Sequence, residues 1–314
     1  MKPMESLRVG VIGVGYLGTH HARIYKTLKG VTLAGVCDID PSKVKLARKF
    51  RAAFYPNHKA LFGQVDAVSV VVPTQGHFQI AKDFLEQGIP VLIEKPMTTT
   101  LEEADILLQL ARQKGLLIQV GHVERFNKAI DTIETIFRSP RFIECHRLGP
   151  FRKRGTEVGV VLDLMIHDID IVLYLVQSPV ERIDAVGVNV LSPFTDIANV
   201  RINFKNGAVA NLTASRITRD FMRKIRIFGD NTYVSLDYMR QKARLYRKEN
   251  GKIDLQKISI AKEEPLRREL QAFTSAVRTG EKPLVSGEDG REALRVALEV
   301  ERMIQDCLAL ALHA

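Results

Sequence analysis

The chain has 314 residues, of which 46% are hydrophobic and 26% charged, and its formal net charge is +10. This composition is typical of a soluble globular protein, and no apolar stretch approaches the length of a membrane span. A chain of this length exceeds the size at which one hydrophobic core usually stops growing, so two domains are expected. The positive charge alone is compatible with nucleic acid, an anionic membrane surface or an anionic small substrate.

The first 122 residues alternate between strand-like and helical segments. Apolar runs of strand type lie at 7–13, 31–37, 66–72, 89–93 and 116–121. Between them, Thr100 and Glu103 form a capping box ahead of a helical segment, and Gly115 supplies its stop. This order predicts an α/β domain over residues 1–122, with a parallel sheet and crossover helices.

A glycine-rich loop follows the first predicted strand in the stretch VGVIGVGYLGTHHA. Gly13, Gly15 and Gly18 have the G-x-G-x-x-G spacing between a strand and a probable helix. Such a loop allows a tight turn, close approach of a pyrophosphate and close packing of helix on strand. Asp38 ends the second predicted strand, where a carboxylate accepts a hydrogen bond from the ribose 2′-hydroxyl and repels a 2′-phosphate. The sequence therefore favours NAD over NADP, although Asp38 is equally able to start the turn DIDPSK.

The stretch VLIEKPMTTT, residues 91–100, ends an apolar strand with a carboxylate, an ammonium and a proline. A buried strand normally excludes these three residue types. In an open parallel sheet, ligands bind beyond the carboxyl ends of the strands. Glu94, Lys95 and Pro96 are therefore expected at the cofactor cleft, with the Lys95 ammonium directed into it.

The second half of the chain, residues 123–314, has helices first and then a long series of strands, which predicts an α+β domain. Apolar and polar residues alternate over residues 198–205, so one sheet face is expected to be apolar and the other polar. Asn206 and Gly207 predict a type I′ hairpin turn. A helix is expected over roughly 288–312.

A helix is also expected over residues 160–176, VVLDLMIHDIDIVLYLV. At 100° per residue, Asp163, His167, Asp170 and Tyr174 form a polar stripe beside an apolar face. Burying these groups is costly unless they are paired or line a cleft. Asp163 precedes His167 by one turn, so it is placed to orient the ring and stabilise its protonated form. The stripe favours a catalytic site over a satisfied core histidine.

Several other functions find no support in the sequence. Cys37, Cys145 and Cys307 lack the spacing of a zinc site or a disulfide framework, so reduced cysteines and no metal are expected. The N-terminus lacks a signal-peptide pattern, which favours the cytoplasm. Basic residues gather in 151–155, 216–226 and 240–248, but solvated surfaces explain such runs more often than nucleic acid does. No nucleophile elbow of a hydrolase is present.

Together, the glycine loop, the EKP sequence at 94–96 and the Asp163–His167 pair resemble the glucose-fructose oxidoreductase, inositol dehydrogenase and MocA family of NAD(P)-dependent oxidoreductases. The resemblance covers essentially the whole chain. It implies an N-terminal Rossmann domain and a C-terminal domain with a large open, mainly antiparallel sheet, often used for subunit packing. It also implies a Lys95-Pro96 bond that is often cis.

The family's site residues carry over to matching positions. Lys95 is then expected near the reacting hydroxyl, His167 as general acid and base, and Asp163 as a substrate ligand or orienting group. The resemblance further implies NAD contacts from Gly13, Gly15, Tyr16, Leu17, Gly18, Asp38, Pro73, Thr74, His77, Glu94 and Lys95.

A narrower similarity lies in QVGHVERFNKAI, residues 119–130, to bacterial members that oxidise the 3-hydroxyl of UDP-N-acetylglucosamine to supply a 3-amino sugar for lipid A. Arg125 and Asn127 open a probable helix there, and Arg125 is placed equally well for substrate or for a structural ion pair. Arg152 and Arg216 are expected to add to a diphosphate site.

Three functions remain open on the sequence. The first is an NAD-dependent nucleotide-sugar 3-dehydrogenase, the second a dehydrogenase of a free sugar or inositol, and the third a non-catalytic dinucleotide-sensing regulator. Basic residues in the second domain favour the first over the second, because a neutral polyol needs no phosphate-binding arginine. The joint presence of Lys95, Asp163 and His167 disfavours the third. A homodimer or homotetramer is expected from the family resemblance.

Overall fold

The computed structural model of the chain describes residues 6–137, 139–151, 158–249 and 251–312. The chain divides into two compact units. Unit 1 comprises Met1–Val123 and Glu264–Glu292, and unit 2 comprises Glu124–Glu263 and Ala293–Ala314. The sequence had placed all of 123–314 in one domain, whereas 264–292 belongs to unit 1.

The first unit contains a six-stranded parallel sheet in the order β3-β2-β1-β4-β5-β6. Its strands are β1 (Leu7–Ile12), β2 (Val31–Cys37), β3 (Ala53–Tyr55), β4 (Ala67–Val70), β5 (Val91–Glu94) and β6 (Ile118–Gly121). Its helices are α1 (Tyr16–Tyr25), α2 (Val44–Phe50), α3 (His77–Glu86), α4 (Leu101–Lys114) and α7 (Pro265–Thr279), with short 3-10 turns at Pro41–Lys43, His58–Leu61 and Thr74–Gly76. This strand order is that of a Rossmann fold, so the predicted α/β class is confirmed.

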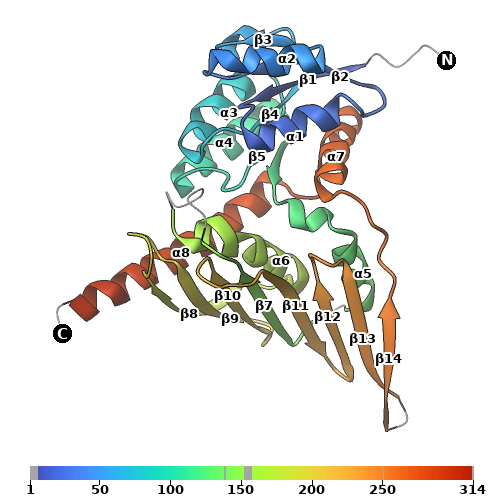
Figure 1. Cartoon of the computed structure of the whole chain (residues 1–314), viewed down its shortest axis with the longest axis vertical. Helices are drawn as coiled ribbons and strands as arrows, with labels where there is room; N and C mark the ends of the chain where they lie inside the picture. Colours follow the sequence, from blue (N-terminus) through green and yellow to red (C-terminus); the bar gives the residue numbers. More distant parts are fainter. Residues whose placement is uncertain (1–5, 138, 152–157, 250, 313–314) are drawn as a thin grey trace. The chain divides into compact units, whose positions relative to one another are not determined.

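Helices cover both faces of the parallel sheet, with α1 and α7 on one face and α3 and α4 on the other (Figure 1). Strands β4, β5 and β6 are buried throughout, as expected of a parallel sheet with two covered faces. Leu270 and Phe273 of α7 join the same core as Val9 of β1, and Ser286 bridges Gln119 of β6. These contacts explain why the late segment 264–292 belongs to unit 1.

The second unit contains an eight-stranded sheet in the order β14-β13-β12-β11-β7-β10-β9-β8. Its strands are β7 (Phe142–Leu148), β8 (Val180–Val188), β9 (Ile197–Phe204), β10 (Val209–Ser215), β11 (Met222–Gly229), β12 (Thr232–Asp237), β13 (Lys242–Glu249) and β14 (Lys252–Ile258). Only β7 and β10 pair in parallel; the other neighbours are antiparallel. The predicted large, mainly antiparallel sheet is confirmed.

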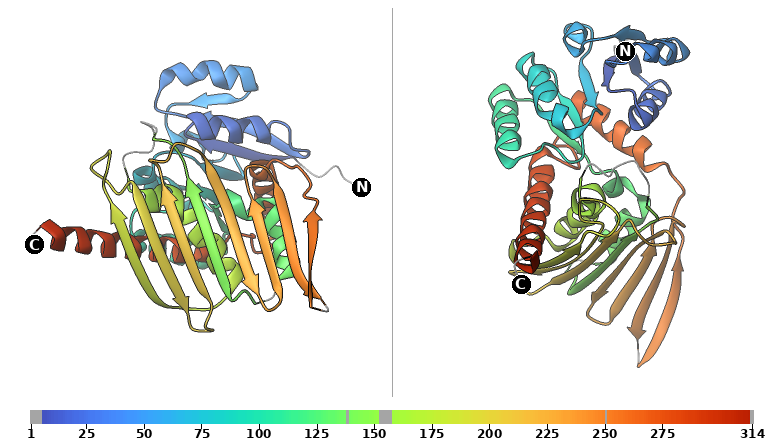
Figure 2. Two further views of the ribbon diagram at one scale, coloured as in Figure 1. Left: turned by 60° about the horizontal axis from the view of Figure 1, so that its bottom comes forward. Right: turned by 60° about the vertical axis from the view of Figure 1, so that its left-hand side comes forward.

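One face of this sheet packs against helices and the other is not covered by any described helix of the unit (Figure 2, left). The helices are α5 (Lys128–Ile136), α6 (Ile166–Val176) and the part of α8 (Gly287–Leu312) that belongs to unit 2, and a 3-10 turn, Val123–Phe126, precedes α5. The predicted alternation holds, because Ala198, Val200 and Ile202 are buried while Asn199 and Arg201 are exposed. On the uncovered face, four rings form a row across neighbouring strands: Phe142, Phe228, Tyr233 and Tyr246.

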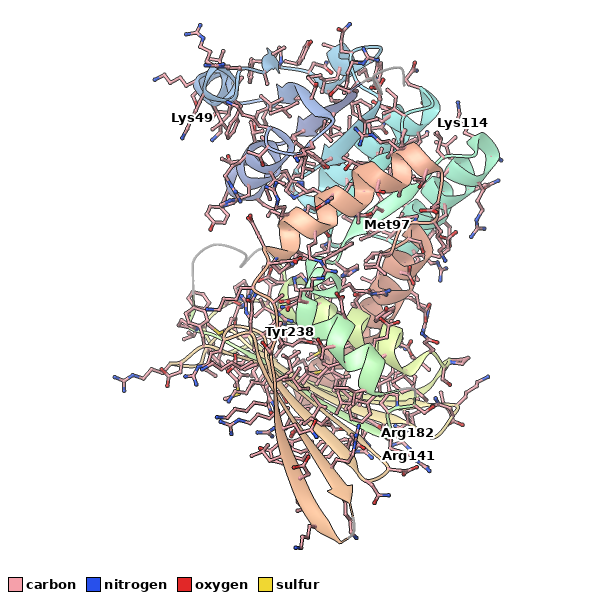
Figure 3. All side chains as sticks on the ribbon, turned by 90° about the vertical axis from the view of Figure 1, so that its right-hand side faces the viewer. Lys49, Met97, Lys114, Arg141, Arg182 and Tyr238 are labelled. Carbon is pink, nitrogen blue, oxygen red and sulfur yellow. The ribbon has the colours of Figure 1, made fainter. Side chains whose placement is uncertain are left out.

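Polar side chains at the rims of the units contrast with their interiors. Figure 3 labels Arg141 and Arg182, whose exposed side chains project from the second unit, and Met97 and Tyr238, which are buried within the first and second units respectively. Burial raises the pKa of the Tyr238 phenol well above its ordinary value, because the phenolate would lose its hydration.

The hairpin between β9 and β10 differs from the predicted two-residue turn. Gly207 has φ of +82°, but Asn206 is not among the residues with positive φ, so the turn is not of type I′. Gly207 N–H donates to the Phe204 carbonyl, and the Asn206 side chain accepts from Ala208 N–H. The loop therefore has three residues, with the glycine in the left-handed position.

The helix predicted over 160–176 also differs, because its first part is a single π-helical turn, Val161–Met165, followed by α6. This segment is called the π-turn below. A π-turn has i→i+5 hydrogen bonds and a smaller rotation per residue than the 100° of an α-helix. In a regular α-helix, residues four apart are about 40° out of line. The wider turn reduces this offset between Asp163 and His167.

The capping box that begins α4 is formed as predicted. The Thr100 side chain accepts from Glu103 N–H, and the Glu103 side chain accepts from Thr100 N–H. We expect Thr100→Ala to lower the free energy of unfolding by about 1 kcal/mol, because a helix N–H loses its acceptor. Urea unfolding followed by circular dichroism measures this loss. The control, Ser139→Ala at an exposed position, should change stability by less than about 0.5 kcal/mol, and equal effects would contradict the assignment.

Candidate active site

The glycine loop between β1 and α1 has the geometry that binding of a pyrophosphate requires. Gly13 has φ of +83°, and a Cβ there would lie 2.5 Å from the Val71 carbonyl oxygen. A Cβ on Gly18 would lie 1.8 Å from the Gly13 oxygen, whereas a Cβ on Gly15 would meet nothing within 4 Å. Gly15 thus faces open space at the start of α1, which no side chain caps. The first-turn N–H groups of this helix are suited to an anion.

Asp38 closes the loop from the end of β2. Its Oδ2 accepts from Val14 N–H at 2.8 Å, and its Oδ1 accepts from Asp40 N–H at 2.9 Å. Asp38 therefore supports the turn, as one of the two interpretations predicts, and it also stands beside the glycine loop. Its contact with a ribose remains a prediction. Each carboxylate oxygen has a second lone pair, so the contacts leave acceptor capacity for a ribose hydroxyl.

The EKP sequence forms a loop at the carboxyl end of β5. The Glu94 carboxylate is held by His21 Nε2 at 3.1 Å and by Lys95 N–H at 3.3 Å. A Cβ on Gly121 would lie 2.7 Å from a Glu94 oxygen, so the absence of a side chain at 121 makes room for this carboxylate. His21 is therefore the side-chain partner of the Glu94 carboxylate at this strand end. The Lys95-Pro96 bond is cis.

His77 links this loop to the end of β4. Its Nδ1 lies 2.9 Å from the Pro96 carbonyl oxygen, and its Nε2 lies 2.8 Å from that of Val72. Burial lowers the pKa of His77, because the imidazolium would lose its hydration. The ring thus braces the loop that carries Lys95. The predicted cofactor contact of His77 itself remains a prediction, as do those of Pro73, Thr74 and Glu94.

A hollow of about 790 Å³ in the first unit does not belong to this edge of the sheet. Its lining includes Asp66, Pro90 and Leu117, which directly precede β4, β5 and β6. It therefore lies at the amino ends of the strands, whereas ligands of open parallel sheets bind at the carboxyl ends. We do not assign it to the cofactor.

The second unit has its own candidate site around the π-turn. Asp163 lines a hollow of about 180 Å³. The lining residues are Arg147, Leu148, Gly149, Pro150, Asp163, Leu164, Arg216, Phe221 and Arg223. The predicted substrate residues Asp163 and Arg216 thus meet at one hollow. His167 follows on α6 and is partly buried. Lys95, by contrast, belongs to the first unit.

Two buried carboxylates of α6 are paired with arginines instead of lining a cleft. Arg125 Nε and Nη2 each donate to Asp170 at 2.8 Å, and the guanidinium lies 4.5 Å from the centre of the Tyr174 ring. Asp170 and Tyr174 of the predicted polar stripe therefore bind Arg125, and only Asp163 and His167 remain as candidate site residues. Of the two readings of Arg125, the geometry favours the structural ion pair.

A second arginine cluster at α6 was missed by sequence reasoning. Arg147 on β7 donates two hydrogen bonds of 2.8 Å to Asp168 and one of 3.0 Å to Glu124, and all three side chains are buried. The two carboxylates raise the pKa of Arg147 well above its ordinary value, against the opposing effect of burial. A carboxylate in an apolar helix, such as Asp168, indicates that a partner of opposite charge exists. Only the folded structure shows that this partner is Arg147.

Arg216, predicted to bind a diphosphate, has its guanidinium largely engaged. It donates to Asp196 Oδ1 at 2.7 Å, to Ser192 Oγ at 2.9 Å and to the Val158 carbonyl at 2.9 Å. These contacts favour a structural role. The Asn127 side chain accepts from Ala129 N–H and caps α5, so it too has a local structural partner. Arg152 lies outside the described residues.

The third arginine at the hollow is Arg223, which the sequence placed only within a basic run. It is exposed, so it is better placed than Arg147 or Arg216 to reach a ligand. Among the residues that the structure describes, no cluster of His, Cys, Asp and Glu has the geometry of a metal site. No helix of the described chain is long and apolar enough to cross a membrane.

Comparison with known proteins gives consistent matches over both units. The family model for the oxidoreductase family with an NAD-binding Rossmann fold matches residues 7–122, and the model for the GFO/IDH/MocA C-terminal domain matches 129–235. UDP-N-acetylglucosamine 3-dehydrogenase of Acidithiobacillus ferrooxidans is 36% identical over 310 residues, which are 96% of this chain and 98% of that protein. A solved structure of that enzyme has a TM-score of 0.92 at 35% identity and covers 96% of this chain and 98% of its own.

More distant relatives share the whole architecture. Myo-inositol 2-dehydrogenase of Thermotoga maritima is 24% identical over 96% of this chain and 97% of its own length. A solved oxidoreductase from Agrobacterium radiobacter, in complex with NAD+, L-tartaric acid and magnesium, has a TM-score of 0.85 at 19% identity, covering 95% of this chain and 96% of its own. At that identity the likeness shows the fold alone.

Asp38 provides a direct test of cofactor preference. We expect the protein to bind NADH at least about tenfold more tightly than NADPH, because a carboxylate beside the ribose repels a 2′-phosphate. Asp38→Asn keeps an acceptor for Val14 N–H, loses the acceptor for Asp40 N–H and removes the charge, so the preference should fall by about tenfold or more. Fluorescence titration of both cofactors measures this ratio. Tighter binding of NADPH by the unaltered protein would overturn the assignment.

Proposed function

The chain belongs to the Gfo/Idh/MocA family of NAD-binding oxidoreductases, and from this premise we propose that it oxidises the 3-hydroxyl of UDP-N-acetylglucosamine or a related nucleotide sugar to a ketone. The observation that carries the substrate proposal is the 36% identity to a UDP-N-acetylglucosamine 3-dehydrogenase over nearly the full length of both chains. The presence of Asp163 and exposed Arg223 at one hollow of the second unit supports a substrate with both hydroxyl and phosphate groups.

In this proposal His167 is the general base that takes the proton of the reacting hydroxyl. Asp163, one turn earlier, orients the imidazole and favours its protonated form. The Lys95 ammonium donates a hydrogen bond to the same hydroxyl oxygen and stabilises the charge that develops as the proton leaves. When bound, NAD would supply the hydride acceptor for the carbon that bears this oxygen. One alcohol and one NAD+ then give one ketone, one NADH and one proton, so atoms and electrons balance.

The residues of the first unit fit NAD. The open space at Gly15 and the uncapped start of α1 suit a pyrophosphate, while Asp38 has acceptor capacity for a ribose hydroxyl. We further propose NAD contacts from the glycine loop residues, including Tyr16 and Leu17, and from the loop that His77 braces. Residues 1–122 then act as the cofactor domain, to which 264–292 is attached, and the rest of 123–314 acts as the substrate domain.

The finer biological assignment is also part of the proposal. A 3-keto nucleotide sugar is a substrate for transamination, so we propose a place before a 3-amino sugar of lipid A, in the cytoplasm. We also propose a homodimer or homotetramer, which the aromatic row on the uncovered sheet face supports. The alternatives are a dehydrogenase of a free sugar or inositol, and a non-catalytic dinucleotide sensor.

Substitution of the two proposed catalytic groups tests the mechanism. We expect His167→Ala and Lys95→Met each to lower kcat by about 100-fold or more with little change in melting temperature, because proton transfer and charge stabilisation are lost. His146→Ala on the uncovered sheet face and Lys49→Met on α2 serve as matched controls and should retain activity. Near-normal turnover in both catalytic variants would reject the mechanism. No NAD reduction by the unaltered protein across a broad sugar panel would favour the sensor.

Arg223 allows a separate test of the substrate class. Turnover should be much faster with UDP-N-acetylglucosamine than with N-acetylglucosamine or inositol. We expect Arg223→Gln to raise the KM for the nucleotide sugar by about tenfold, because a charge-assisted bond to phosphate is lost. The control is Arg226→Gln, since Arg226 is bound to Glu144 at 2.7 Å, and it should leave KM unchanged. Preference for a free sugar or inositol would replace the nucleotide-sugar assignment by the second alternative.

A further inference from the structure

A half-buried glutamate of helix α8 lies against the start of the π-turn. Glu301 belongs to the part of α8 within unit 2, and it lies between the core residues Val300 and Ile304. Its Oε1 is buried and has no hydrogen-bond partner among the described residues. Burial raises the pKa of this carboxyl group, although the Leu162 N–H and the charge of Arg216 oppose the shift. The proposed reaction makes no use of Glu301, so its burial needs another reason.

The contacts of Glu301 are with the backbone that begins the helix of Asp163 and His167. Leu162 N–H donates to the Glu301 carboxyl group. A Cβ on Gly159 would lie 2.3 Å from Glu301 Oε1, so the carboxyl end of Glu301 packs closely against the backbone of residue 159. Glu301 therefore acts as an acceptor for a first-turn N–H group that has no partner inside a helix.

The neighbouring groups hold the same segment from its other sides. Val160 N–H donates to the Thr195 carbonyl at 2.8 Å, and Arg216 donates to the Val158 carbonyl at 2.9 Å. Arg216 is itself held by Asp196. Residues 158–162 are thus fixed at three points from three different parts of the second unit. Such support suits a turn with non-standard hydrogen bonding, because π-turns are rare and occur frequently at functional sites.

We propose that Glu301 is a positioning residue for the reaction, an inference that rests on the proposed roles of Asp163 and His167. By accepting from Leu162 N–H, it maintains the π-turn that brings Asp163 into line with His167. The function of the carboxyl group is that of an acceptor of the right length, and its negative charge is not required. Misplacement of a reacting group by about 1 Å is sufficient to lower a rate by about 100-fold.

Two substitutions separate the acceptor from the charge and the volume. Glu301→Gln retains a carbonyl acceptor of the same length, so kcat should stay within about threefold of the unaltered protein. Glu301→Met retains the side-chain volume without an acceptor, and kcat should fall by at least about tenfold with an unchanged KM for NAD. Neither variant should lower the melting temperature at neutral pH. The folded-state pKa is raised, so this carboxyl group destabilises the fold as pH rises above its ordinary value, and both variants remove that effect.

A structural readout accompanies the kinetics. Hydrogen exchange of the backbone around Leu162 should be faster in Glu301→Met than in Glu301→Gln or the unaltered protein. If the methionine variant fails to fold, Glu301→Asp withdraws the carboxyl group by one methylene and should show the same loss of kcat and faster exchange. Full activity of the methionine variant, or equal impairment of the glutamine and methionine variants, would overturn the proposal.

His167→Ala, measured in parallel, distinguishes this failure from that of the proposed function. If His167→Ala is inactive and Glu301→Met is fully active, only the role of Glu301 is wrong. If His167→Ala is active, the proposed mechanism is wrong and Glu301 loses its role as a positioning residue, whatever the exchange rates show.

Discussion

The second unit depends on one constraint, which is that charges buried in an apolar helix must be neutralised where they stand. Helix α6 is hydrophobic almost throughout, yet it carries Asp168 and Asp170 in its interior-facing positions. Each is bound by a single arginine through two hydrogen bonds of 2.8 Å. Removing one partner of such a pair leaves an uncompensated buried charge, which is far more costly than losing a surface pair. These pairs fix the helix that carries His167.

In the first unit, polar groups near the loop that carries Lys95 are likewise bound where they are buried. Glu94 ends a buried strand and is bound by His21 from α1, while the ring of His77 from α3 lies between the Pro96 carbonyl of the loop and the Val72 carbonyl that follows β4. The loop is thus supported by neighbouring helices through groups that do not themselves present a free charge. A rigid support of this kind is what a reacting group needs, because small displacements are costly in rate.

Local features of the fold were predictable because they depend on residues close together in the sequence. Thr100 and Glu103 form their capping box through bonds within one helical turn, and Gly115 ends that helix with φ of +64°. Gly13, Gly15 and Gly18 act within one strand-turn-helix segment. The alternation over β9 requires only that one face of a sheet be apolar. These patterns were sufficient for the α/β class and for the family resemblance, and the resemblance implied the mainly antiparallel second sheet.

The sequence by itself determined where strands and helices form and which residue types a dinucleotide site would need, because periodicity and capping are local properties. Only the tertiary structure decided which charged side chains form structural ion pairs. In the sequence, Arg216 looks like a phosphate ligand, and Arg125 suits a substrate and a structural ion pair equally well. In the structure, Asp196 and Asp170 bind them. The attachment of 264–292 to the first unit and the π-turn beside Glu301 likewise depend on contacts between distant segments. The energy of such an ion pair depends on its burial and on the distance between the charges, and neither quantity can be read from the sequence.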